Sequence, residues 1–152
     1  FLGSTARIIV LPLTEALSRS APRLVFSSTC NHVLYDARCK VNSSNFRFQG
    51  VVAAVNGNAV TVTNLSTNGD GWATGGYVTI GGVDFRTIND HTGDVITLLQ
   101  PFPAGTPAVG ATVEVFAGCD RSLETCASKF DNPENFSGHR FVPRENLFEK
   151  GI

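Results

Sequence analysis

Four cysteines, arranged as two pairs around a long stretch of strand and turn signals, constrain this chain most. Eight residues separate Cys30 from Cys39, six separate Cys119 from Cys126, and 79 lie between the pairs. Because the first and last strands of a barrel can lie side by side, both pairs can meet in space. The pattern predicts that residues 29–39 and 118–130 form one buried metal site, rather than leaving four separate buried thiols.

The stretch between the pairs predicts a mainly β insertion over residues 46–117. Two β-branched runs flank Asn56-Gly57-Asn58, and an Asn-Gly pair in that setting is a strong hairpin signal. Strands are expected at 51–55, 60–63, 77–80, 83–88, 94–99 and 111–116, with turns at 81–82 and 89–93 and a proline-rich crossing at 101–107. Short strands at this spacing are typical of a small antiparallel β-barrel or sandwich.

The two flanking regions lack this β pattern. Residues 1–45 are expected to form an N-terminal arm with the first cysteine pair, including one helical turn at 14–19. Residues 118–152 are expected to hold the second pair, a short helix over 120–130 and a draped tail. Asn132-Pro133 ends the helix, because a residue before proline avoids helical angles.

The cysteine spacing leaves three chemistries open. Disulfides are typical of secreted chains, and no secretory signal is visible. Structural zinc usually takes cysteines separated by about two to four residues, which is tighter than the spacings here. Each iron of an iron–sulfur cube takes one thiolate, so its ligands can come from well-separated loops. The wide spacing mildly favours a cluster but does not by itself exclude zinc.

The residues around the cysteines resemble one known group of proteins. Three segments carry the resemblance: CNHVLYDARC at 30–39, GCDRSLETC at 118–126 and KFDNPENFSG at 129–138. They are similar to the C-terminal region of phage tail-tip proteins, a group that includes tail tip protein L of lambda-type phages and the hub proteins of gene transfer agents. The likeness covers roughly residues 22–143 and is most specific at the cysteine-bearing ends.

The resemblance implies a cofactor and a function. In that group four cysteines bind a [4Fe-4S] cluster, with a β insertion of variable length between the pairs, so the implied ligands here are Cys30, Cys39, Cys119 and Cys126. It also implies a non-enzymatic structural protein of the distal tail, at the tail tip or baseplate hub of a siphophage-like virion assembled in the host cytoplasm. The implied partners are hub and tail tube proteins, in a homotrimer around the tail axis.

Two other functions compete with this one. A cluster-based electron-transfer protein is the first, although the chain lacks the tight Cys-x2-Cys run of ferredoxins. A zinc-stabilised binding module is the second. The net charge of −1, without a long run of like charges, argues against a nucleic-acid surface. No stretch approaches the roughly 20 apolar residues that span a bilayer, so no membrane binding is expected.

The remaining candidate residues have plainer interpretations. His32 could ligate or tune the site, but a hydrogen-bonded neighbour is the expected role, and His91 and His139 carry no motif. Asp120 and Glu124 are expected on a solvated helix face, because no nucleophile or base motif accompanies them. Trp72 is expected to cap one end of the barrel rather than to contact a partner. The chain has no Gly-x-Ser-x-Gly elbow and no phosphate-binding glycine loop.

Overall fold

The structure is a computed structural model that describes residues 26–103 and 106–142. The helical turn expected at 14–19 and the tail beyond residue 142 lie outside the described residues. No helix in the described part of the chain is long and apolar enough to cross a membrane.

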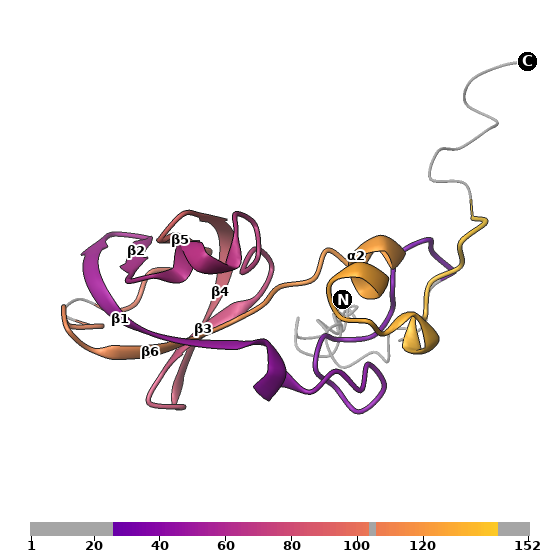
Figure 1. The fold of residues 1–152 in the computed structure, drawn as a ribbon, viewed down its shortest axis with the longest axis horizontal. Coiled ribbons are helices and arrows are strands. Elements are labelled where there is room, and N and C mark those ends of the chain that lie inside the picture. The colour runs from indigo at the N-terminus through magenta and orange to yellow at the C-terminus, as the bar shows by residue number, and fades with distance from the viewer. Residues whose placement is uncertain (1–25, 104–105, 143–152) are drawn as a thin grey trace, which may run out of the picture.

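The described residues form a closed antiparallel barrel in the strand order β1-β2-β5-β4-β3-β6 (Figure 1). Its strands are β1 (Arg47–Asn56), β2 (Ala59–Val62), β3 (Tyr77–Ile80), β4 (Asp84–Thr92), β5 (Val95–Leu98) and β6 (Thr112–Phe116). Two 3-10 turns, η1 (Ser43–Phe46) and η2 (Leu65–Asn68), accompany them. The expected mainly β architecture is confirmed, and it is a barrel rather than a sandwich.

Two long strands close the barrel by bending. The first half of β1 pairs with β6 and its second half with β2, and the register shifts between Val52 and Ala54. Likewise β4 pairs with β3 and then with β5, with a shift between Ile88 and Asp90. Bulges of this kind increase the local bend and twist of a strand. Each long strand can therefore belong to both halves of the barrel wall.

Alternation along the strands builds the barrel core. Inward side chains such as Val60, Ile96 and Val113 are fully buried, whereas their immediate strand neighbours are more exposed. One polar side chain, His91, shares this interior: the main-chain N–H of Ala73 donates to its Nδ1 at 3.4 Å, and its Nε2 lies 2.9 Å from the Gly93 carbonyl oxygen. Both ring nitrogens of this buried side chain therefore have a main-chain hydrogen-bond partner.

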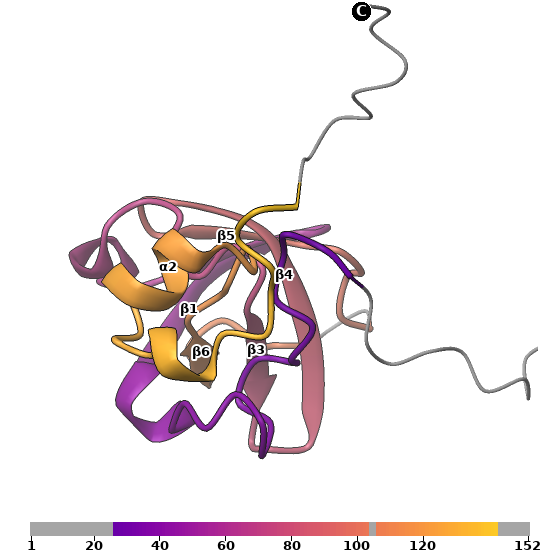
Figure 2. The same cartoon turned by 90° about the vertical axis from the view of Figure 1, so that its right-hand side faces the viewer.

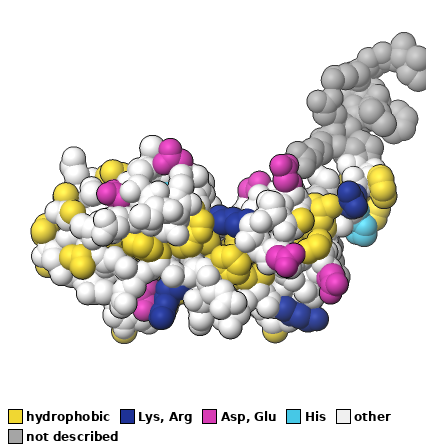
Figure 3. All heavy atoms as spheres, in the orientation of Figure 1, with side chains coloured by type: hydrophobic (Ala, Val, Ile, Leu, Met, Phe, Trp, Pro, Cys, Tyr) yellow, Lys and Arg dark blue, Asp and Glu magenta, His cyan; other side chains and the backbone are white. Residues whose placement is uncertain are grey.

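The chain segments before and after the barrel, residues 26–46 and 117–142, pack at one end of it and are called the cysteine module here. It contains α2 (Leu123–Ser128) and η3 (Pro133–Asn135), which lie side by side over the barrel end in Figure 2. Its own core is Val41, Ala117 and Phe130, with Trp72 packed against both this cluster and the barrel core. Figure 3 shows the molecule narrowing between barrel and module, with hydrophobic side chains gathered there.

The helix is shorter than the sequence predicted. It begins at Leu123 because Arg121 has a positive φ of 63° and Ser122 is the N-cap, accepting a hydrogen bond from the Thr125 main chain. Its last residue is Ser128, ahead of Asp131, which also has a positive φ. The helical prediction over 120–130 was therefore right in type and wrong in both bounds.

Candidate metal centre

Each cysteine pair is presented by irregular backbone next to a short element. Cys30 and Cys39 lie at the two ends of a looped segment that precedes η1, and the Cys30 main-chain N–H donates to the Arg121 carbonyl at 2.9 Å. Cys119 follows β6 by three positions, and Cys126 lies within α2. The two segments are thus fastened to each other beside the sulfurs.

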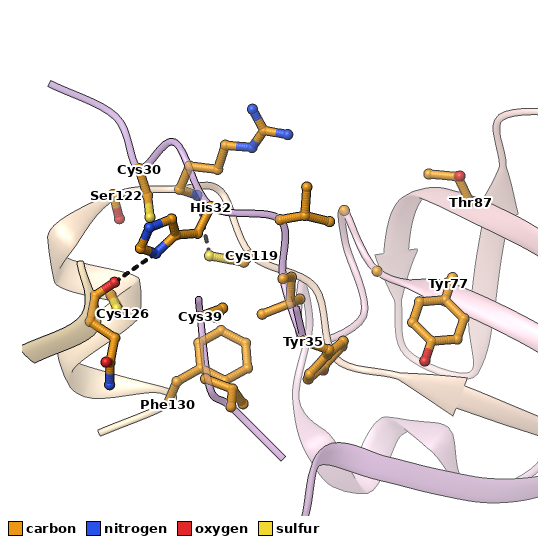
Figure 4. A pocket seen from close by; sticks show the side chains of 17 residues that line it. Cys30, His32, Tyr35, Cys39, Tyr77, Thr87, Cys119, Ser122, Cys126 and Phe130 are labelled. Atoms are coloured by element: carbon orange, nitrogen blue, oxygen red, sulfur yellow. Dashed lines mark hydrogen bonds between the residues drawn. The ribbon is translucent and has the colours of Figure 1, made fainter. Parts of the chain in front are cut away.

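All four cysteines line one cavity of about 280 Å³. Figure 4 shows them grouped at one end of this cavity around the ring of His32, with Tyr77 and Thr87 at the far end, on the barrel. All four are free thiols rather than disulfides. The sequence predicted a buried site, but only Cys126 is buried, and the other three cysteines are partly exposed.

Every sulfur has a polar neighbour. The main-chain N–H of Arg121 donates to Cys119 Sγ at 3.3 Å, and that of Ser137 donates to Cys30 Sγ at 3.5 Å. Asn132 Nδ2 lies 4.0 Å from Cys39 Sγ, and the Cys126 thiol donates to the Asn132 carbonyl at 3.1 Å. Hydrogen bonds to thiolate sulfur tune iron–sulfur clusters and orient metal ligands, so this shell suits such a site.

Burial and mutual proximity raise the pKa values of two of the thiols. Desolvation, together with the charges of the neighbouring cysteines, raises the pKa of Cys126. Desolvation also raises the pKa of Cys119; the hydrogen bond from the Arg121 main chain opposes this shift, while Asp120, Cys30 and Cys39 add to it. A cation that binds here must displace these protons, and its positive charge removes the repulsion between the thiolates.

The arrangement of the ligands bears on which metal group they could hold. Among the described residues, no three His, Cys, Asp or Glu side chains converge closely enough to hold one metal ion. A zinc ion needs its sulfurs at about 2.3 Å, all around a single point. A cluster instead binds one thiolate at each iron, so its four thiolates need not meet at a single point.

The other sequence-predicted residues lie as follows. His32 lines the cavity, with its Nδ1 3.0 Å from the Asn135 carbonyl oxygen, so it is the expected hydrogen-bonded neighbour. His139 is exposed and its ring lies 4.0 Å from that of Phe26. Asp120 precedes the helix instead of sharing a face with Glu124, and accepts from the Ser122 main chain. Trp72 covers the barrel end, as expected.

Two residues of the site escaped the sequence analysis. Lys129 was expected only near the end of a helix; its Nζ instead donates to the carbonyls of Trp72 and, at 2.8 Å, Gly118. Burial lowers the pKa of this lysine, while the nearby Cys119 and Asp120 oppose that shift. Asn132 was expected only as a helix stop. Nothing local reveals either contact, because their partners are distant in sequence.

Comparison with solved structures gives the class of protein to which this fold and site correspond. A chain from the virion of a native gene transfer agent particle is similar to this chain, with a TM-score of 0.69 and 25% sequence identity. The likeness covers 90% of this chain and 50% of that chain, so this chain spans half the length of the virion chain. The expected likeness to virion proteins is confirmed.

Comparison with models of protein families identifies the sequence family. The profile of the family described as phage conserved hypothetical protein BR0599 matches residues 71–146, which is half of the chain. This chain belongs to that family. No curated protein sequence matches the chain significantly. A phage-related origin is thus confirmed, whereas the iron–sulfur cluster, the tail-tip position and the trimer stay predictions.

Proposed function

We propose that this chain is a non-enzymatic structural protein of a phage or gene-transfer-agent type virion, at the tail tip or baseplate hub of the distal tail. Two findings support it: membership of a phage protein family, and a fold shared over 90% of the chain with a virion component. A structural role also suits the architecture, in which a rigid closed barrel is fastened to a small module at one end. Hub and tail tube proteins are the proposed partners, in a trimer around the tail axis.

The cysteine site has a structural role in this proposal. Cys30, Cys39, Cys119 and Cys126 would hold a [4Fe-4S] cluster, and the observation that carries this is that four free thiols, from the segments before and after the barrel in sequence, line one cavity. When bound, the cluster supplies iron–thiolate bonds that join both segments to one point, which couples metal binding to folding of the module. The chain's own N–H groups orient the sulfurs.

Metal and sulfide analysis tests the cofactor. Protein purified without exposure to oxygen is expected to be brown, to absorb broadly in the visible range, and to contain about four irons and four sulfides per chain. Zinc without sulfide would instead identify a zinc-stabilised module. A colourless, metal-free protein with an intact barrel would end the cluster proposal. Reversible reduction in a protein absent from virions would favour the electron-transfer alternative.

Labelling of particles tests the location. A short epitope inserted at the exposed Gly57-Asn58 turn between β1 and β2 keeps the cysteine module untouched. Gold-labelled antibody is expected at the distal end of the tail in electron micrographs. Label along the tube, on the head, or on no part of an intact particle would contradict the tail-tip assignment, whatever the metal content.

A further inference from the structure

Two residues outside the cysteines contact both cysteine pairs: Arg121 through its main chain alone, and Asn132 through its main chain and its side chain. The side chain of Asn132 donates from Nδ2 to the Cys39 carbonyl oxygen at 2.6 Å. Its main chain brackets Cys126: the Asn132 N–H donates to the Cys126 carbonyl at 3.0 Å, and the Asn132 carbonyl accepts from the Cys126 thiol at 3.1 Å. Cys39 and Cys126 come from opposite sides of the barrel in sequence, and Asn132 joins them.

The local backbone does not account for this use of the side chain. Asn132 is the N-cap residue of η3, and asparagine there normally accepts a hydrogen bond from a main-chain N–H of its own helix. Asn132 makes no such cap. Its Oδ1 instead accepts from the Asn135 side chain at 2.6 Å, which leaves Nδ2 directed at Cys39. The side chain is therefore engaged in a long-range contact.

Further hydrogen bonds link the residues after Asn132 to the neighbourhood of Cys30. The Asn135 carbonyl is the partner of His32 Nδ1, and Ser137, two residues further on, donates to Cys30 Sγ. Residues 132–137 thus cross the site and contact the neighbourhood of three cysteines. The side-chain amide of Asn132 suits the first position of this segment, because one planar group presents a donor to Cys39 and an acceptor to Asn135.

We propose that Asn132 is a positioning residue that holds Cys39 and Cys126 in place relative to each other, so that the four thiols are arranged before any cofactor arrives. The proposal rests on the proposed function only where a cluster is invoked. The arrangement of the thiols in the metal-free chain can be tested by itself.

The test uses Asn132→Asp, which keeps the shape but turns an acceptor toward the Cys39 carbonyl, and Asn132→Ser, whose shorter side chain withdraws the donor from Cys39 without adding charge. The matched control is Asn68→Asp, since Asn68 Nδ2 likewise donates to a carbonyl, that of Leu65, at 3.2 Å on the barrel. Native, reduced, metal-free full-length chains are alkylated with iodoacetamide, and the rate at each cysteine is mapped by mass spectrometry. Circular dichroism checks the barrel.

We expect Cys39 and Cys126 to react about ten-fold faster in both Asn132 variants, because losing one hydrogen bond shifts a local opening equilibrium by that order. Cys30 and Cys119 are expected to keep their rates, and Asn68→Asp to behave as wild type. A general loosening would accelerate all four cysteines together. That result, unchanged rates, or loss of the barrel in the Asn132→Ser variant would each overturn the proposal.

Reconstitution with iron and sulfide adds a second readout. Because loss of a residue that orients metal ligands typically weakens metal binding about ten-fold or more, Asn132→Asp is expected to retain less iron than Asn68→Asp. Its residual cluster should have a more negative reduction potential, since the added charge favours the oxidised state. If wild type takes up no iron and sulfide, the proposed function fails, and the alkylation pattern still decides the role of Asn132.

Discussion

At the scale of single residues, Tyr35 joins the cysteine module to the barrel. Its ring packs edge-on against Tyr77, Phe116 and Phe130, and its hydroxyl donates to the Ala117 carbonyl at 2.8 Å. Desolvation, followed by the charges of Tyr77 and the cysteines, raises the pKa of this tyrosine far above its ordinary value. The hydroxyl is therefore a permanent donor at any pH at which the protein is handled.

Tyr35→Phe is expected to lower the free energy of unfolding by about 1–2 kcal/mol, because the buried Ala117 carbonyl loses this donor while the ring packing remains. Denaturant titration followed by circular dichroism measures it. The control is Tyr77→Phe: Tyr77 stacks on Phe116 in the same aromatic cluster, but its hydroxyl has no hydrogen-bond partner among the described residues. Equal effects of the two changes would contradict the role given to the Tyr35 hydroxyl.

At the scale of elements, the sequence predicted each strand of the barrel but not all their bounds. The sequence predicts a turn over residues 89–93. The structure continues β4 to Thr92, because Asn89 and Asp90 face solvent across a bulge and the inward His91 finds main-chain partners. Those partners lie in another loop, so no local pattern could indicate them. The start of β1 at Arg47 was missed for a similar reason: its pairing partner is β6.

The loop before β3 crosses the chain after β6 at a very close approach. A Cβ added at Gly118 would collide with the Thr74 carbonyl oxygen and the Gly76 main chain, both of which are rigid. Gly118→Ala is therefore expected to cost about 1–3 kcal/mol of stability, measured by denaturant titration. Gly57→Ala is the comparison: there a Cβ meets nothing, and only the positive φ of 59° is penalised, by about 1 kcal/mol. A smaller loss at Gly118 than at Gly57 would show that the crossing can relax.

The β4–β5 turn is fastened to η2 by one carboxylate. Asp94 Oδ1 accepts from the Ser66 main chain at 2.8 Å, and hydrogen bonds from the Ser66 main chain and side chain lower the pKa of this aspartate. The resulting stabilisation is present above the unfolded pKa of about 3.9 and is lost as the pH falls through the lower folded value.

Asp94→Asn is therefore expected to melt at a lower temperature than wild type at neutral pH, and this difference should shrink as the pH falls below about 4. Thermal melts across that pH range measure it. Asp90→Asn, at an exposed position of β4, is the control. A difference between wild type and Asp94→Asn that stays constant down to pH 2 would indicate that the charge of Asp94 is irrelevant.

At the scale of the whole molecule, the barrel and the cysteine module are two bodies joined at a narrow, apolar junction. The convergence of Cys30, Cys39, Cys119 and Cys126 on one site could be predicted, because the first and last strands of a closed barrel can be neighbours. The segments that precede and follow such a barrel then lie close together. The residues that surround the cysteines could not be predicted. Asn132, Ser137 and Lys129 contact the site through amide, main-chain N–H and ammonium groups, which carry no sequence motif, and only the path of residues 129–137 brings them there.

Removal of iron from protein that contains the proposed cluster is expected to destabilise the cysteine module but not the barrel. After anaerobic chelation, amides in residues 27–45 and 118–137 are expected to exchange with deuterium faster, while the barrel strands keep their protection, because their core is complete without a metal. Hydrogen exchange read by mass spectrometry resolves these peptides. Parallel loss of protection in β2 and β5 would mean that the barrel depends on the cofactor.

The main-chain N–H of Ala117 donates to the Phe46 carbonyl at 3.0 Å, so the residue before β1 and the residue after β6 lie next to each other. This has a consequence for biogenesis. In the nascent chain, bringing Cys39 to Cys119 means closing a loop of 79 residues. Once the barrel has folded, only short stretches remain to be ordered, which reduces the entropic cost by about 2 kcal/mol, since each halving of a loop saves about 0.6 kcal/mol. We therefore expect the barrel to fold first, and the proposed cluster would then bind between two segments that the barrel has already brought together.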